Sequence, residues 1–350
     1  MEITYLLNIE LYFLCFFTSF VICMLIKKFF VHNINRKQSE VKVQNIHWIP
    51  ISRLGGLGVF VTIILFWFIN KFNHPSSLTN IYSLLLLSSL PTFLVGLLDD
   101  IFDKVPPLTR LMTTFLTSII SIFIILTVNK TGDILNVFFL FEVFFVILLI
   151  TFLPHMFNLI DGINGLCSSC GIIILLTIFI IFEDKIIYET STFIFLMVLS
   201  VIPFLILNIF TSKLFLGDCG SYFIGFVCSF IISLHILNDE DFYFYHAVLI
   251  LFYPIFETIF TCYRRIINGS KIFKADRNHL HSNIYNLIKN KYPNKVYLQT
   301  LCFLFLIPLI LIGPIVFYYN KDNSNFSIIF LLLLSCLYFF IFNYFTRKEI

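Results

Sequence analysis

The sequence predicts an all-α integral membrane protein, a polytopic bundle with about eleven transmembrane helices. Hydrophobic residues make up 59% of the 350 positions and charged residues only 12%. Soluble domains carry roughly 25% charged residues. No segment between the apolar runs is long enough to fold alone, so residues 1–350 are expected to form a single transmembrane domain. The runs lie at residues 5–30, 55–72, 81–98, 109–128, 136–154, 166–182, 192–210, 220–237, 246–263, 296–319 and 326–345.

The basic residues predict how these helices are oriented. Of the 23 Lys and Arg residues, 19 fall on the side that is reached after each odd-numbered run, and only four fall on the other side. Cytoplasmic loops of membrane proteins carry such an excess of positive charge. We therefore expect the N-terminus outside and the C-terminus in the cytoplasm, with the protein in the inner (plasma) membrane. The net formal charge of +3 is too small to indicate a nucleic-acid partner.

Five polar stretches interrupt the apolar pattern, and all of them fall on the predicted cytoplasmic side. They are residues 51–58, 98–103, 158–166, 216–221 and 275–282. Unrelated polar loops would be scattered over both sides of the membrane. Their shared side predicts one site that faces cytoplasmic substrates.

The central stretch contains Asn158, Asp161 and Asn164, spaced three residues apart between two apolar runs. At this spacing the three side chains share roughly one face of a helical turn. A carboxylate near the hydrocarbon costs about 2.5–3.5 kcal/mol on insertion scales, so its presence indicates a function. The alternative is a polar interhelical loop in which Asn and Gly only cap the helix ends.

Three carboxylates, from Asp99, Asp100 and Asp103, close the third apolar run. Groups this close repel one another unless a cation, a basic partner or a proton intervenes. Lys104 and Arg110 could supply the basic partner, in which case the cluster would be a plain cytoplasmic cap. The alternative is a functional carboxylate cluster.

The stretch around Asp218 combines glycines, a carboxylate and a serine immediately before the eighth apolar run. Glycines let backbone N–H groups approach a ligand closely, and a helix N-terminus attracts phosphate. Asp218 would repel that phosphate unless it holds a divalent cation between the two. Mg²⁺ binds in this way, through one or two carboxylates and the phosphate oxygens of a substrate.

The longest loop, residues 264–295, is expected to contain a short amphipathic helix around residues 280–288. Arg277, His279 and His281 stand at its start, and this basic group suits the recognition of a diphosphate. Zinc is not expected, because no cysteine lies nearby. Arg53, before the second run, either contacts phosphate or is one more cytoplasmic basic residue.

Taken in order, these stretches resemble the polyprenyl-phosphate N-acetylhexosamine-1-phosphate transferases, glycosyltransferase family 4. The family's D-D-x-x-D corresponds to residues 99–103, and its N-x-x-D-G-x-x-G-L to residues 158–166. Its G-D-x-G-S corresponds to residues 217–221, and its D-R-x-H-x-H to residues 276–281. The resemblance is to the branch that uses undecaprenyl phosphate and UDP-N-acetylglucosamine.

The resemblance implies a reaction in which a lipid phosphate attacks the β-phosphorus of a UDP-amino-sugar and UMP leaves. It implies that Asn158 and Asp218 hold Mg²⁺, or Mn²⁺ in its place. It further implies catalytic roles for Asp99, Asp100 and Asp161, with either Asp99 or Asp100 orienting or deprotonating the lipid phosphate. The residues expected to contact substrate are Arg53, Asp103, Asn164, Arg277, His279 and His281.

Two departures from the family pattern concern the sugar. Many bacterial members carry Asp where this chain has Asn164, and many that use UDP-N-acetylglucosamine have a third His where Ser282 stands. N-acetylglucosamine is the first expectation, followed by N-acetylfucosamine or N-acetylquinovosamine. The product would open the synthesis of a cell-surface polysaccharide, such as a cell wall polymer or a lipopolysaccharide O-antigen. A homodimer is compatible with the sequence.

Two other classes of protein compete with this interpretation. A membrane prenyltransferase also uses D-D-x-x-D with Mg²⁺, but it would need a second Asp-rich motif, and residues 158–166 offer only Asp161. A transporter would place its polar groups so that they face alternating sides of the membrane. Here they collect on one side.

Overall fold

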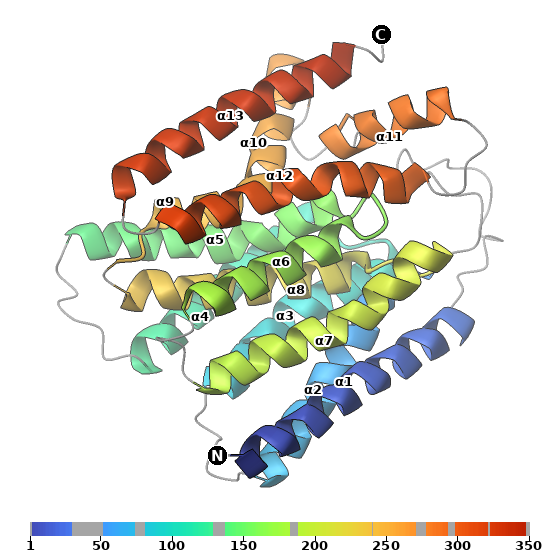
Figure 1. Ribbon diagram of the computed structural model, residues 1–350, viewed down its shortest axis with the longest axis vertical. Helices are drawn as coiled ribbons and strands as arrows, with labels where there is room; N and C mark the ends of the chain where they lie inside the picture. Colours follow the sequence, from blue (N-terminus) through green and yellow to red (C-terminus); the bar gives the residue numbers. More distant parts are fainter. Residues whose placement is uncertain are drawn as a thin grey trace.

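In the residues that it describes, a computed structural model shows a bundle of thirteen α-helices, most of which run side by side (Figure 1). It describes residues 2–29, 52–73, 81–128, 137–182, 188–239, 241–270, 278–292, 298–320 and 323–347. Within these ranges the β-type pairing is limited to one isolated parallel bridge between Ser52 and Leu214. The all-α prediction is therefore confirmed for the described part of the chain.

The helices follow the predicted apolar runs closely. They are α1 (Glu2–Phe29), α2 (Gly55–Asn73), α3 (Ile81–Phe102), α4 (Pro107–Val128), α5 (Val137–Ile160), α6 (Leu166–Ile181), α7 (Tyr188–Thr211), α8 (Gly217–Asn238), α9 (Phe244–Ile250), α10 (Phe252–Ile267), α11 (Leu280–Lys291), α12 (Leu298–Asn320) and α13 (Ser324–Arg347). The helix expected around residues 280–288 is α11.

Among the described residues, eight helices are long and apolar enough to cross a membrane, namely α1, α3, α4, α5, α7, α8, α12 and α13. The apolar parts of α2 and α6 are shorter, and α9 with α10 forms a bent pair that would count as a ninth span. Each of the eleven predicted runs thus coincides with a helix or with this pair. A bundle of many membrane-spanning helices is what these lengths support, and the count of eleven stays a prediction.

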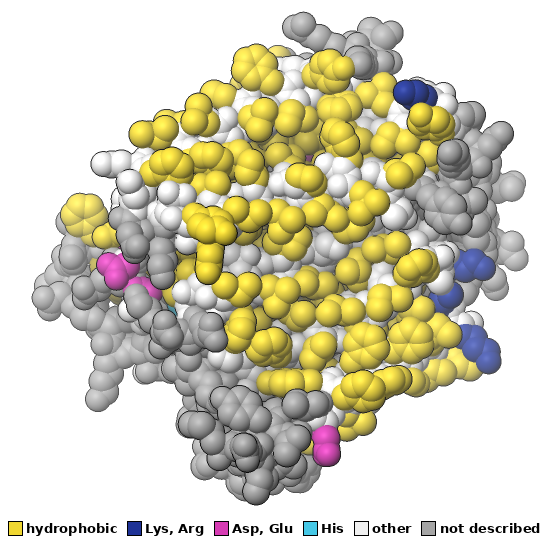
Figure 2. Space-filling model, viewed as in Figure 1, with side chains coloured by type: hydrophobic (Ala, Val, Ile, Leu, Met, Phe, Trp, Pro, Cys, Tyr) yellow, Lys and Arg dark blue, Asp and Glu magenta, His cyan; other side chains and the backbone are white. Residues whose placement is uncertain are grey.

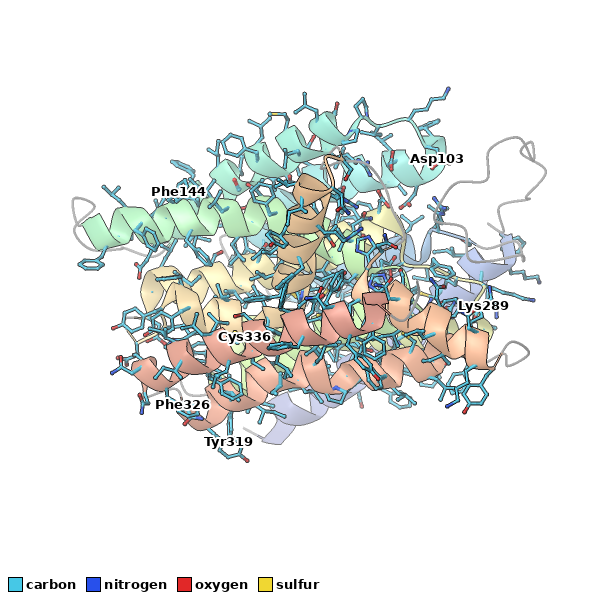
Figure 3. The ribbon with its side chains drawn as sticks, turned by 90° about the horizontal axis from the view of Figure 1, so that it is seen from above. Asp103, Phe144, Lys289, Tyr319, Phe326 and Cys336 are labelled. Carbon is cyan, nitrogen blue, oxygen red and sulfur yellow. The ribbon has the colours of Figure 1, made fainter. Side chains whose placement is uncertain are left out.

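The apolar run over residues 246–263 forms two helices rather than one. The chain bends by 89° between α9 and α10, at Leu251. Pro254 explains the break, because proline has no N–H and its ring clashes with the carbonyl of the residue four positions earlier, here Ile250. As a result α10 stands steeply across the direction of its neighbours (Figures 1 and 3).

Helix α8 is the centre of the bundle. It packs mainly against α5 and α3 and also against α2, and almost all of its residues are buried. Gly220 lies so close to Gly56 of α2 that a Cβ on either would collide with the other's backbone. Small residues permit this approach of two helix backbones in a membrane. The first residues of α8 are consequently enclosed by other helices.

Hydrophobic side chains cover most of the face shown in Figure 2, as expected where helices contact lipid. On that face the basic side chains lie along one edge, and the acidic ones lie toward the other sides. Figure 3 shows Asp103 and Lys289 at one end of the bundle and Tyr319 and Phe326 at the other. The polar stretches that the structure describes therefore gather at the end that carries the basic residues.

We expect the two ends to face opposite sides of the membrane. A cysteine introduced at Asn290, beside Lys289, should react only with a reagent that crosses the membrane. One introduced at Asp241, in the exposed turn after α8, should react with an impermeant maleimide added to intact cells. The parent protein is the control, because eight of its nine cysteines are buried or partly buried. Labelling of both positions from outside would contradict the predicted orientation.

Candidate active site

The ends of α3, α5 and α8 meet at one point, and they bring the predicted residues together. Asp99 and Asp100 lie on the last turn of α3, Asn158 lies on the last turn of α5, and Asp218 lies on the first turn of α8. Asp161 follows α5 in the connection to α6. The structure thus brings these separate stretches together, and their roles in one site stay a prediction.

Asp100 binds the N-terminus of α8 through both of its carboxylate oxygens. Oδ1 accepts the backbone N–H of Asp218 at 2.9 Å, and Oδ2 accepts that of Cys219, also at 2.9 Å. The first N–H groups of a helix have no partner within the helix, and its N-terminus carries partial positive charge. The carboxylate of Asp100 supplies an acceptor for two of these N–H groups.

Gly217 makes this contact possible. Its φ of 76° lies in the left-handed region, which glycine adopts without strain. A Cβ at this position would collide with the carbonyl oxygen of Arg53 and would lie 2.7 Å from Oδ2 of Asp100. Only a residue without a side chain allows the carboxylate to reach the helix end.

Arg110 joins Asp99 to Asp218. Its Nη1 lies 3.0 Å from Oδ2 of Asp99 and 2.7 Å from Oδ2 of Asp218. The sequence indicates Arg110 only as a local partner for the carboxylates of residues 99–103, and its pairing with Asp99 is confirmed. Arg110 lies on the first turn of α4. Because it also contacts Asp218, it connects the end of α3 to the start of α8 and does more than cap α3.

Asn158 reaches the other oxygen of Asp218. Its Nδ2 donates to Oδ1 of Asp218 at 2.8 Å and to Oγ of Ser221 at 3.3 Å. An amide and a carboxylate in contact offer the oxygen donors that a hard cation such as Mg²⁺ prefers. Among the described residues no three His, Cys, Asp or Glu side chains are placed to bind one metal ion by themselves. A Mg²⁺ ion held by the oxygens of Asn158 and Asp218 would need its remaining ligands from substrate phosphates and water.

Negative charge accumulates around the start of α8. Removal from water raises the pKa of Asp161 well above its usual value, and the carboxylates of Asp218 and Asp100 raise it further. The N–H of Gly217 and the guanidinium of Arg53 act in the opposite direction. A cation bound among these carboxylates would relieve their mutual repulsion.

Arg53 and Asp103 lie at the rim of the site. Arg53 Nη1 is 3.7 Å from Oδ1 of Asp103, and both side chains are partly exposed. The strand-like pairing of Ser52 with the segment before α8 fixes this position, through Ser52 N–H to Lys213 O at 3.0 Å and Phe215 N–H to Ser52 O at 2.7 Å. The structure thus brings both residues to the predicted end of the bundle, where their substrate contacts stay a prediction.

Asn164 lies inside the protein rather than on the surface of the site. It is 1% exposed, its Nδ2 donates to Oγ of Ser212 at 2.6 Å, and its Oδ1 accepts from Asn208 at 3.4 Å. Asn208 also accepts the N–H of Gly165 at 2.6 Å. These bonds give Asn164 a structural role that fixes the loop to α7, and they leave its expected contact with the nucleotide without support in this geometry.

His279 and His281 stand at the start of α11, where their rings stack in parallel with centroids 5.3 Å apart. Both are buried, and burial lowers the pKa of His281 to about 4. His281 lies against Gly162, since a Cβ on that glycine would be 2.6 Å from its Nε2. The pair is thereby brought next to Asp161. Arg277, the third basic residue of this motif, is outside the described residues.

A second polar layer lies one turn deeper in the bundle. His155 Nε2 is 3.0 Å from Oγ1 of Thr114, and its Nδ1 is 3.0 Å from the hydroxyl of Tyr222. His155 precedes Asn158 by one turn and Tyr222 follows Asp218 by one turn, so this layer supports both. The sequence signal was a histidine inside an apolar run, which usually indicates a function or a partner.

The sequence comparisons agree with this geometry. Residues 82–235 match glycosyl transferase family 4, and this region includes α3, α4, α5, α6, α7 and most of α8. The resemblance expected from the motifs is confirmed over this region, which is similar to glycosyl transferase family 4. The match favours a transferase over the prenyltransferase and transporter alternatives.

Individual relatives point to a narrower group. An undecaprenyl-phosphate α-N-acetylglucosaminyl 1-phosphate transferase of Thermotoga maritima is 27% identical over 236 residues, 67% of this chain and 68% of that protein. Proteins of the same name from Haemophilus influenzae and Yersinia pestis are each 32% identical, over 98 and 97 residues. These two matches cover about a quarter of each chain.

We expect Gly217→Ala to destabilise the protein and to remove the site geometry, because the added methyl would displace the carboxylate of Asp100 from the start of α8. The melting temperature of the purified protein in detergent measures this. Gly269→Ala is the matched control, since Gly269 also has a positive φ, of 63°, but nothing lies within 4 Å of its added Cβ. Backbone strain should lower the free energy of unfolding of that variant by only about 1 kcal/mol. Equal losses in both variants would contradict the close contact at Gly217.

Proposed function

We propose that the protein transfers an N-acetylhexosamine 1-phosphate group from a UDP-sugar to undecaprenyl phosphate, with release of UMP. The family match and the names of the relatives support transfer to undecaprenyl phosphate. The observation that carries the proposal for the site is the contact of Asp218 with both Asn158 and Arg110. Asn158 and Asp218 would offer oxygen ligands for a cation, and Arg110 adds a fixed positive charge beside them. A reaction between two phosphate groups requires such positive charge.

The reaction forms one phosphorus–oxygen bond and breaks another. An oxygen of the lipid phosphate attacks the β-phosphorus, and the bond from that phosphorus to the oxygen that bridges to the α-phosphorus breaks. A phosphate monoester has a second pKa of about 6, so the attacking oxygen is largely ionised at neutral pH and needs little help from a base. The main barrier is the approach of one anion to another.

The residues of the site address this barrier. Asn158 and Asp218 would hold Mg²⁺, which when bound neutralises the diphosphate. Arg110 supplies a permanent positive charge between Asp99 and Asp218. In Asp100 both carboxylate oxygens bind the backbone of α8. Those of Asp99 accept from the backbone N–H of Val105 at 3.1 Å and from Arg110 at 3.0 Å, which places Asp99 beside the positive charge of the site. We therefore assign the contact with the lipid phosphate to Asp99, and Asp100 acts by holding α8 in place.

For the donor we propose UDP-N-acetylglucosamine first, with UDP-N-acetylfucosamine and UDP-N-acetylquinovosamine as alternatives. The site would face the cytoplasm, where UDP-sugars are made, from the inner (plasma) membrane. The lipid-linked product would then begin a cell-surface polysaccharide.

Membranes that contain the protein should move label from one UDP-amino-sugar into lipid when undecaprenyl phosphate and Mg²⁺ are present. A panel of labelled UDP-amino-sugars identifies the donor. Because the reaction conserves a diphosphate bond, labelled UMP should also exchange into UDP-sugar when the lipid product is supplied. Release of free sugar or inorganic phosphate instead would indicate a hydrolase and would refute the proposal.

The variant that tests the metal site is Asp218→Asn, which keeps size and shape but removes the charge. A neutral amide oxygen binds a hard cation more weakly, so the rate should fall by orders of magnitude while the protein still accumulates. Higher Mg²⁺ concentrations should restore part of the rate. Lys213→Gln, in the loop before α8, is the control and should cost far less. A near-normal rate for Asp218→Asn with unchanged Mg²⁺ dependence would exclude Asp218 as a metal ligand.

A further inference from the structure

The second polar layer joins three helices of the candidate site, one turn deeper in the bundle. Thr114 lies on α4, His155 on α5 and Tyr222 on α8. Nε2 of His155 is 3.0 Å from Oγ1 of Thr114, and Nδ1 is 3.0 Å from the hydroxyl of Tyr222. Both ring nitrogens thus have a partner, and His155 connects α4 to α8.

This layer repeats the contacts of the site above it. There Arg110 of α4 lies 2.7 Å from Asp218 of α8, and Asn158 of α5 donates to Asp218 at 2.8 Å. Each residue of the second polar layer lies three or four positions from its counterpart on the same helix. At this spacing the two residues share one helix face. The two layers therefore hold α4, α5 and α8 together at successive levels.

The hydrogen bonds of the second polar layer run in one direction. The hydroxyl of Thr114 donates to the carbonyl oxygen of Leu111 at 2.9 Å, and it has only one proton to donate. Toward His155 it must accept, so Nε2 carries the proton of the ring. A second proton, on Nδ1, would put a positive charge into the bundle one turn from that of Arg110, which is unfavourable. Nδ1 therefore accepts from Tyr222, and the chain of donors ends at Leu111, the residue next to Arg110.

Joining two helices does not by itself require a histidine. One turn deeper, Thr151 of α5 donates to Ser118 of α4 at 3.2 Å, and this pair of hydroxyl groups links the same two helices. Ionisable residues are more costly than serine or threonine within an apolar run, and their presence indicates a function. What distinguishes His155 is its second contact, with α8, directly below the contact between Arg110 and Asp218.

We propose that His155 is a positioning residue, which holds α4 against α8. Through this connection it keeps the guanidinium of Arg110 between Asp99 and Asp218. His155 itself contacts no substrate in this role and acts through Arg110, the fixed positive charge of the site. The inference rests on the proposed function for the reaction that Arg110 serves, and it adds a residue that lies outside the four motifs.

The test is a double-mutant cycle on the transfer rate at saturating substrates, measured on the purified full-length protein. His155→Leu removes both hydrogen bonds but leaves an apolar side chain of comparable size. Because Arg110 would then be displaced from its two carboxylates, we expect the rate to fall about tenfold or more. In an Arg110→Gln protein the fixed charge is already lost, so the same change at His155 should lower the rate no more than about twofold.

Thr151→Val is the matched control, because it removes the contact between α4 and α5 that does not reach α8. Its melting temperature should fall, since a hydrogen bond between helices is lost, but its transfer rate should stay near that of the wild type. Three results would overturn the inference: a normal rate for His155→Leu, an equal loss with and without Arg110, or an equal loss in Thr151→Val. If His155→Leu does not accumulate, Tyr222→Phe, which removes one hydroxyl, replaces it in the same cycle.

Melting temperatures separate this inference from the proposed function. In the same cycle the losses of melting temperature should also be less than additive, because His155 and Arg110 hold the same two helices together. If the wild type transfers no UDP-amino-sugar, the proposed function fails, and coupled losses of melting temperature still support the connection between His155 and Arg110. Additive losses would overturn it.

Discussion

The N-terminus of α8 is the constraint on which the rest of the site depends. The first N–H groups of a helix have no partner within the helix, and leaving them buried and unpaired would cost free energy. Here Asp100 accepts the N–H groups of Asp218 and Cys219. Because this carboxylate lies on the last turn of α3, that helix has to end at the level at which α8 begins.

This placement brings the polar side chains of the candidate site together. With Asp100 bound to the backbone of α8, the side chain of Asp218 is held between Asn158 and Arg110. Arg110 in turn keeps Asp99 close to Asp218. A carboxylate that binds the backbone of α8 and the carboxylates that we propose as ligands thus lie together at one helix end. The close packing of α8 with α2 at Gly56 and Gly220 leaves little freedom to rearrange them.

Much of this arrangement could be predicted from the sequence, because it follows from local patterns. Apolar runs of the right length predict the helices, and the common side of the polar stretches predicts that Asp99, Asn158 and Asp218 meet. The division of labour between Asp99 and Asp100 could not be predicted, since adjacent carboxylates look alike until their partners are known. The contact of Arg110 with Asp218 joins residues 108 positions apart, and the burial of Asn164 depends on α7 packing beside its loop.

Two further features of the ninth apolar run are visible in the sequence alone. Pro254 inside this run predicts a break in a helix, and the 89° bend lies just before it. Glu257 in the same run is an ionisable residue in an apolar helix, which indicates a function by itself. Both residues lie in α10, the helix that precedes His279 and His281 in the chain.

The most direct test of the central role of the α8 N-terminus compares Asp99→Asn with Asp100→Asn in melting temperature and in transfer activity. Asn at position 100 can offer only one acceptor oxygen for two backbone N–H groups. We therefore predict that Asp100→Asn lowers the melting temperature markedly and loses activity with it. Asp99→Asn should lose activity while its melting temperature stays close to that of the wild type. An Asp100→Asn protein that melts like the wild type would contradict the role of Asp100 in holding the start of α8.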